Sequence, residues 1–199
     1  MKSHNQSSNI LTHKWKQLWC LHHWCKGLPV HVLYGKGYQL QPIKDLSQPG
    51  QFACQEVVDL VTEKGSFKKV RILGPERKVS QVEISLTDAI KLGLKPPVRD
   101  SGDLAGSPGL TMVGPNGSVE LKNGVIAACR HIHMTPADAE QLGVKDKEVV
   151  KVSCGGERGL IFDKVLVRVN EAFFLEMHVD TDEGNAAMIK TGDMLEIVK

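Results

Sequence analysis

Short apolar runs dominate the chain after residue 27, and turn residues separate them. Alternation of apolar and polar positions with a period of two is typical of strands, whereas a period near 3.6 indicates helices. The pattern predicts strands at 69–73, 81–85, 110–114, 118–121, 124–134, 149–154, 165–169, 172–179 and 194–198. Short helices fit 87–92, 136–142 and 183–189, each beginning near a Thr or Asp that can cap it. We therefore expect a mainly β fold, with two β-barrels and short helical caps.

Part of this pattern recurs along the chain. Residues 82–94 align with residues 132–144, and residues 180–193 give a fainter third copy. Such an internal pseudo-repeat indicates two or more related structural units. We expect one barrel unit over 28–128 and a second over 129–199.

Residues 1–27 differ from the rest because they hold all three tryptophans and four of the eight histidines. Apolar residues from Ile10 to Leu21 fall roughly on one helical face. This N-terminal extension is therefore interpreted either as an amphipathic helix that docks on a partner or as a poorly ordered tail. The two interpretations have equal support from the sequence.

Composition narrows the class of protein. The chain of 199 residues is 41% hydrophobic, which is enough for a real core. Its net charge of +2 provides no field for holding nucleic acid. No apolar run approaches the ~18–20 residues of a membrane span. Five cysteines, an odd number, favour a reducing compartment, so we expect a cytoplasmic protein.

The sharpest chemical feature is a His-x-His pair, His131 and His133. Residues two apart in a strand share a face, so both imidazoles converge while Ile132 points the other way. Two strand histidines form half of a zinc site, and His178, in another predicted strand, is the expected third ligand. In the pseudo-repeat, Glu83 falls where His133 lies, and His178 where His131 lies. The alternative is a pair of partly exposed strand histidines without a metal.

The segment 74–85 places two charged groups after a tight Gly-Pro turn. The carboxylate of Glu83 lies on the polar face of its predicted strand and is a candidate metal ligand. Arg77, six residues earlier, is a candidate for holding phosphate. An ordinary surface region with ion pairs would have the same composition.

The loop 95–109 is rich in glycine and carries Arg99 and Ser101. Glycine lets backbone N–H groups approach a ligand closely, so amides together with an arginine would form an anion cradle. The loop matches no Walker or dinucleotide motif. A plain connecting loop explains the same spacing.

Several longer motifs add a family resemblance. "RILGPERK", "PPVRDSGDLAGSPG", "RHIHMTPADAEQLGVKD" and "LEMHVDTDEGNAA" resemble the phosphate propanoyltransferase family, the phosphotransacylases of propanediol utilisation in bacterial microcompartments. The resemblance covers about residues 33–199. It implies two β-barrels with helical caps and two zinc ions in the active site. The implied reaction interconverts acyl-CoA plus phosphate with acyl phosphate plus CoA.

The same resemblance implies roles for individual residues. His131, His133 and His178 would bind one zinc ion, and Glu83 would help to bind the other. Phosphate contacts are implied for Arg77, also the implied catalytic residue, and for Ser101; CoA contacts are implied for Lys44, Arg71 and Asn185.

The chain departs from the family near its N-terminus. Family members carry a second His-x-His before the "LYGKGY" segment, where this chain reads "CLHHWCKGLPVHVLYGKGY". Counting back without gaps places His22 and Trp24 at the two ligand positions, so one histidine is lost. A deletion after residues 29–30 is the other explanation. Either way, Glu83 lacks at least one expected partner.

Three functional hypotheses follow. The first is a zinc-dependent phosphate propanoyltransferase acting on propanoyl-CoA and phosphate. The second is a catalytically impaired family member that serves as a binding or shell-associated subunit. The third is a zinc hydrolase of thioesters. The resemblance also implies that residues 1–27 are an encapsulation segment for shell proteins, with the microcompartment lumen as the location, and it is compatible with a homo-oligomer.

Overall fold

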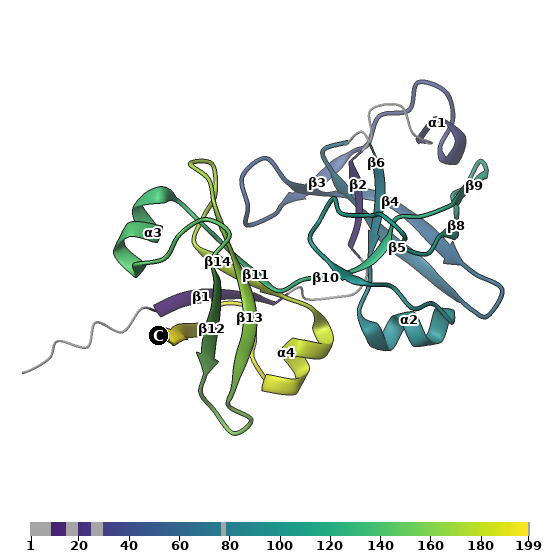
Figure 1. Ribbon diagram of the computed structural model, residues 1–199. Helices are drawn as coiled ribbons and strands as arrows, with labels where there is room; N and C mark the ends of the chain where they lie inside the picture. Colours follow the sequence, from purple (N-terminus) through teal and green to yellow (C-terminus); the bar gives the residue numbers. More distant parts are fainter. Residues whose placement is uncertain (1–8, 15–19, 25–29, 77–78, 199) are drawn as a thin grey trace, which may run out of the picture. The chain divides into compact units, whose positions relative to one another are not determined.

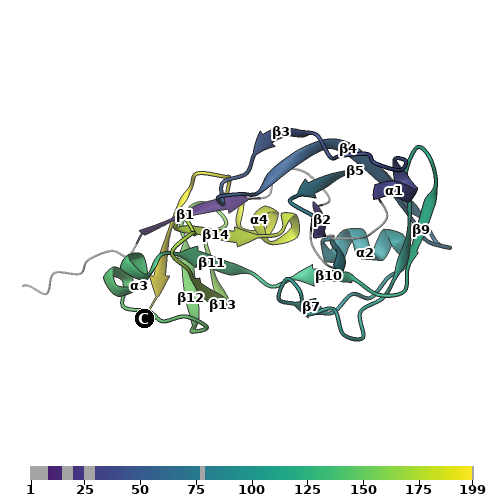
Figure 2. The same ribbon diagram turned by 90° about the horizontal axis from the view of Figure 1, so that it is seen from above.

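The computed structural model describes residues 9–14, 20–24, 30–76 and 79–198. It is mainly β, as the sequence predicts. The chain divides into two compact units, which Figures 1 and 2 show from two directions. The barrel unit comprises residues 1–17 and 129–199, and the sheet unit comprises residues 18–128.

The described strands of the barrel unit close into a barrel in the order β1-β14-β11-β13-β12-β15. β1 completes the closure because it pairs in parallel with β14 and antiparallel with β15. β11 lies between β13, to which it is parallel, and β14, to which it is antiparallel. The bounds are β1 Asn9–Lys14, β11 His131–Met134, β12 Val149–Cys154, β13 Leu160–Val169, β14 Glu176–Val179 and β15 Met194–Val198.

Two short helices follow the strands that carry histidines. α3 (Pro136–Leu142) follows β11, and α4 (Thr181–Ala187) follows β14. Each begins with a capping box, in which the N-cap side chain and an acidic residue three positions later satisfy each other's backbone N–H groups. The two helices lie on opposite sides of the barrel (Figure 1). The barrel interior is filled by aliphatic side chains, among them Ile132, Val152, Val165, Val167 and Met177.

The described strands of the sheet unit follow the order β7-β10-β6-β2-β5-β4-β8-β9, with β3 paired to β4. β7 and β9 lie at the two ends of this path, and each pairs with one strand among those that the structure describes. The second closed barrel that the sequence predicts is therefore not confirmed. The bounds are β2 Cys20–Trp24, β3 Pro42–Asp45, β4 Phe52–Val61, β5 Ser66–Gly74, β6 Val79–Glu83, β7 Val98–Arg99, β8 Leu110–Val113, β9 Ser118–Leu121 and β10 Val125–Ala128.

Helices α1 (Val30–Leu33) and α2 (Leu86–Leu92) belong to the same unit. α2 follows β6 and begins at Ser85, whose side chain accepts a hydrogen bond from the Asp88 backbone N–H. Cys54 lies in the core of the sheet unit and Cys154 in that of the barrel unit. Within the described residues, no helix is long and apolar enough to cross a membrane.

Of the two interpretations of the N-terminal extension, the amphipathic helix is wrong for the residues that the structure describes. Residues 9–14 form β1 and residues 20–24 form β2. Each strand fills a gap between two others: β1 lies between β14 and β15, and β2 between β5 and β6. Pairing on both edges satisfies backbone N–H and C=O groups that would otherwise be left open, and this tertiary gain outweighs a weak helical pattern. The extension therefore supplies one strand to each unit.

Candidate metal centre

A patch of four polar side chains spans two neighbouring strands of the barrel. In the antiparallel register of β11 and β14, His131 lies opposite His178, and His133 lies opposite Glu176. Residues two apart in a strand share a face, so all four side chains lie on the same side of this strand pair. The patch brings together the three histidines that the sequence predicts as ligands and adds a carboxylate.

The three imidazoles form a compact cluster. Ring centroids are 4.7 Å apart for His131 and His133, 4.9 Å for His131 and His178, and 4.7 Å for His133 and His178. One ligand atom from each ring lies within 4.8 Å of the other two. His133 and His178 are buried, and His131 is partly exposed. Among the described residues, three or more histidine, cysteine or acidic side chains lie close enough to share a metal ion only in this cluster of three histidines.

His133 provides the test of whether a metal fits. Its Nδ1 is buried and has no hydrogen-bond partner among the described residues. Burial, and after it the neighbouring rings of His178 and His131, together lower the pKa of His133 from 6.5 to about 2. The ring is therefore neutral near pH 7 and carries a lone pair. A neutral imidazole nitrogen without a partner is what Zn²⁺ binds, so the residues present fit that ion.

The other two rings are oriented through one nitrogen each. His131 Nδ1 lies 2.8 Å from the Cys129 carbonyl oxygen, and His178 Nε2 lies 3.1 Å from Glu176 Oε2. Metal-bound histidines commonly donate their second ring N–H to a carbonyl or a carboxylate, which fixes the ring. The Phe173 ring covers His133, with 4.3 Å between centroids.

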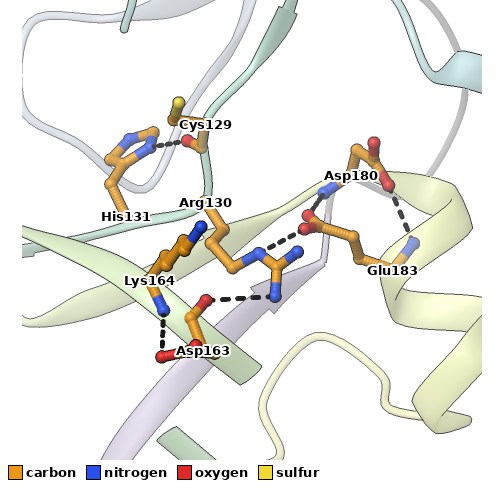
Figure 3. A network of polar contacts seen from close by, with 7 residues as sticks. All are labelled: Cys129, Arg130, His131, Asp163, Lys164, Asp180 and Glu183. Carbon is orange, nitrogen blue, oxygen red and sulfur yellow. Dashed lines mark hydrogen bonds and ion pairs between the residues drawn. The ribbon is translucent and has the colours of Figure 1, made fainter. Parts of the chain in front are cut away.

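Arg130, directly before His131, is the centre of a polar network (Figure 3). Its Nε lies 2.6 Å from Glu183 Oε1, and its NH1 donates to the Asp163 carbonyl oxygen at 3.2 Å. The second oxygen of Glu183 accepts a hydrogen bond from the Asp180 backbone N–H, 2.9 Å away. Burial raises the pKa of the Glu183 carboxyl, and the Arg130 guanidinium acts in the opposite direction. The network joins the start of β11 to the first turn of α4.

In the sheet unit, one buried glutamine connects two predicted site residues. Gln81 Nε2 lies 2.5 Å from Glu83 Oε1 and 2.9 Å from Ser101 Oγ, while Gln81 Oε1 accepts the Gly102 N–H at 2.7 Å. Glu83, the expected metal ligand, and Ser101, the expected phosphate contact, therefore share one hydrogen-bonded cluster. The amide of Gly102 is already engaged, and Arg99 pairs with Asp103 at 2.7 Å. Two groups of the predicted anion cradle, the Gly102 N–H and the Arg99 guanidinium, therefore already have partners within the protein.

The remaining predicted site residues lie apart from these clusters. Lys44 is exposed on β3. On β5, Arg71 NH1 donates to the Cys54 and Gln55 carbonyl oxygens, where β4 has an irregular register. Asn185 is on α4, and Arg77 lies outside the described residues.

The candidate ligands occupy equivalent places before three helices. Each stands two residues before the N-cap: Glu83 before Ser85, His133 before Thr135, and His178 before Asp180. His178 therefore matches His133, which corrects the sequence alignment of His178 with His131. Position −4 from the cap is Gln81, His131 or Glu176 in the three cases. Sequence reasoning missed Gln81 and Glu176, although their spacing of two from a candidate ligand was the available signal.

Comparison with known proteins places the chain in a family. A family model described as "Phosphate propanoyltransferase" matches residues 22–190. The chain belongs to the phosphate propanoyltransferase family. Every candidate site residue named above lies within the matched span.

Curated relatives support this assignment at high identity. A phosphate propanoyltransferase of Thermotoga maritima is 59% identical over 171 residues, which are 85% of this chain and 81% of the relative. One from Priestia megaterium is 55% identical over 164 residues, 82% of this chain and 76% of the relative. One from Listeria monocytogenes is 51% identical over 170 residues, 85% of this chain and 80% of the relative.

Proposed function

We propose that this protein is a zinc-dependent phosphate propanoyltransferase. The observation that carries the proposal is the cluster of His131, His133 and His178, in a chain of this family, with an unpartnered buried nitrogen on His133. In the reaction, a phosphate oxygen attacks the thioester carbonyl carbon of propanoyl-CoA. The C–S bond then breaks, CoA leaves as a thiolate that takes up a proton, and propanoyl phosphate forms.

Zinc, when bound by the three histidines, would act as a Lewis acid toward the thioester oxygen or the departing sulfur. Two properties of the histidines in the cluster support this role. Both buried rings are held by neighbours, so the ligand set needs little rearrangement. For His133, neutrality near pH 7 means that no proton has to leave before the metal binds.

Substrate contacts are proposed from the family resemblance. Arg77 and Ser101 hold phosphate, and Lys44, Arg71 and Asn185 contact CoA. The hydrogen bond from Gln81 to Ser101 supports a fixed position for that hydroxyl. Glu83 is the proposed ligand of a second zinc ion. Its place two residues before a helix N-cap, like those of His133 and His178, supports this role.

The test measures CoA release and acyl phosphate formation from propanoyl-CoA with and without phosphate, together with zinc content. We expect turnover that needs phosphate, and loss of one bound zinc ion and of turnover in the double variant His131→Ala/His133→Ala. His31, an exposed histidine on α1, provides the matched control His31→Ala, which should keep both. Arg77→Ala should lower phosphate-dependent turnover, because a contact to phosphate is lost. Unchanged zinc in the double variant would place the metal elsewhere.

The missing second His-x-His motivates a second candidate, a catalytically impaired member that acts as a binding or shell-associated subunit. One bound zinc without turnover would support it, whereas two zinc ions with turnover would reject it. A thioester hydrolase would release CoA at the same rate without phosphate.

For residues 1–27, the proposed role in encapsulation has to be tested by removing residues 1–8, because a longer truncation removes β1. Reduced co-purification with shell proteins is the expected result.

A further inference from the structure

We propose that Glu176 is a positioning residue that fixes the orientation and tautomer of His178 for metal binding. The inference rests on the zinc site of the proposed function. It concerns a carboxylate that sequence reasoning did not single out.

The contact is short and enclosed. Glu176 Oε2 lies 3.1 Å from His178 Nε2, and the exposed fractions of the two side chains are 12% and 4%. Both residues project from β14 on one face, because they are two positions apart. In this setting the carboxylate accepts a hydrogen bond from the Nε2–H group of the ring.

The tautomer follows from this bond. A neutral imidazole carries its proton on one nitrogen and its lone pair on the other. With the proton held at Nε2 by Glu176, the lone pair of His178 lies on Nδ1. Glu176 thereby selects the nitrogen that is able to bind a metal ion.

Glu176 is not one of the candidate ligands. Among the described residues, only the three histidines have ligand atoms that all lie within 4.8 Å of one another. The carboxylate reaches the cluster through His178. His131 has the same arrangement, since its Nδ1 lies 2.8 Å from the Cys129 carbonyl oxygen. Two of the three rings are thus fixed from outside by an oxygen.

Two variants of Glu176 separate positioning from direct ligation. Glu176→Ala removes the acceptor, and we expect zinc affinity, measured by competition with a chelator, to fall about 10–100-fold. Glu176→Gln keeps an oxygen that can accept the Nε2–H bond but is a poor zinc ligand, so its loss should be smaller. Glu157→Ala, on an exposed loop of the same unit, is the matched control and should bind zinc as the wild type does. Unchanged affinity in Glu176→Ala would overturn the proposal. So would equal losses in the Ala and Gln variants together with an altered visible spectrum of the Co²⁺-loaded protein, because they would indicate a direct ligand.

A second measurement uses zinc-free wild-type protein and does not depend on whether the variants fold. Nitrogen-15 NMR of the histidine rings reports which nitrogen carries the proton. We expect the Nε2–H tautomer for His178, and a mixture in Glu176→Ala. An Nδ1–H tautomer in the wild type would overturn the proposal. Wild-type protein that binds no zinc but shows the Nε2–H tautomer would refute the zinc dependence of the proposed function and leave the Glu176 contact standing.

Discussion

Arg130 Nε lies 2.6 Å from Glu183 Oε1, and this pair connects the two chain segments that carry the candidate zinc ligands. Arg130 directly precedes His131 on β11, and Glu183 lies in α4, the helix that follows His178. The exposed fractions of 33% and 18% place the pair between a surface ion pair and a buried one. The carboxylate also caps α4 through the Asp180 N–H. Loss of the pair should therefore affect both the stability of the barrel and its metal site.

A double-mutant cycle tests this connection. We expect Arg130→Met and Glu183→Gln each to lower the free energy of unfolding, with a coupling energy of about 1–2 kcal/mol, between the values for exposed and buried pairs. Urea unfolding of the zinc-free proteins gives the coupling, and chelator competition gives the effect on zinc affinity. Additive effects of the two substitutions would show that the contact contributes nothing by itself.

Closure of the barrel by β1 leads to a prediction about the N-terminal segment. Thr12 pairs with Met177 of β14, in a strand that also pairs with β15. A proline inside a strand with partners on both sides removes a backbone donor, so Thr12→Pro should cost about 2–3 kcal/mol of stability. Thr12→Val, which keeps the backbone donor, is the control. Thermal unfolding of the two variants provides the measurement. Equal unfolding temperatures of the two variants would contradict a barrel closed by β1 and would indicate that residues 9–14 are a separate extension.

Gln81 is predicted to support the sheet-unit cluster. Replacement by Met, of similar size, leaves the Gly102 N–H and the Ser101 hydroxyl without their glutamine partner. A lost buried hydrogen-bond partner costs about 1–3 kcal/mol, so stability should fall by that order. The KM for phosphate should rise more than the KM for propanoyl-CoA, because Ser101 is the proposed phosphate contact. A variant with both constants unchanged would separate Gln81 from the site.

The sheet unit should lose stability at alkaline pH. Burial raises the pKa of Tyr34 from 10.0 to about 12 and that of Cys54 from 9.0 to about 12. Both groups release protons on unfolding, so their contribution is complete below about pH 9 and is lost as the pH rises toward 12. The Tyr34 hydroxyl donates to the Val57 carbonyl oxygen, a bond that Tyr34→Phe removes. Unfolding between pH 9 and 12 should show a smaller pH dependence in that variant, and an identical slope would contradict the assignment.

Much of the β structure could be predicted from local pattern. The strands β8, β9, β12 and β15 and the helices α2, α3 and α4 lie close to their predicted ranges. One predicted strand, 124–134, is divided into β10 and β11, which belong to different units. β4, with ten residues, was not predicted, although its burial alternates over much of its length. Glu56 on its buried face, and Val57 and Val61 on its other face, break the alternation of apolar and polar residues that sequence analysis detects.

The candidate site was predicted unevenly for a physical reason. A spacing of two residues in a strand fixes that His131 and His133 share a face, whatever the rest of the fold does. Whether His178 lies next to this pair depends on the register of β11 against β14, which is a pairing between strands far apart in the sequence. Glu176 entered the cluster through the same register. Gln81 was missed because its partner Ser101 is 20 residues away in a loop.

By itself, the sequence determined the mainly β class, the capped helices and the His-x-His pair, since these depend on side-chain periodicity and on contacts within a few residues. Tertiary structure alone decided that residues 9–14 complete a barrel and that three imidazoles and one carboxylate gather on two adjacent strands. Backbone N–H and C=O groups at an open strand edge can pair with more than one segment. Which segment pairs with them depends on the whole fold and not on local propensity.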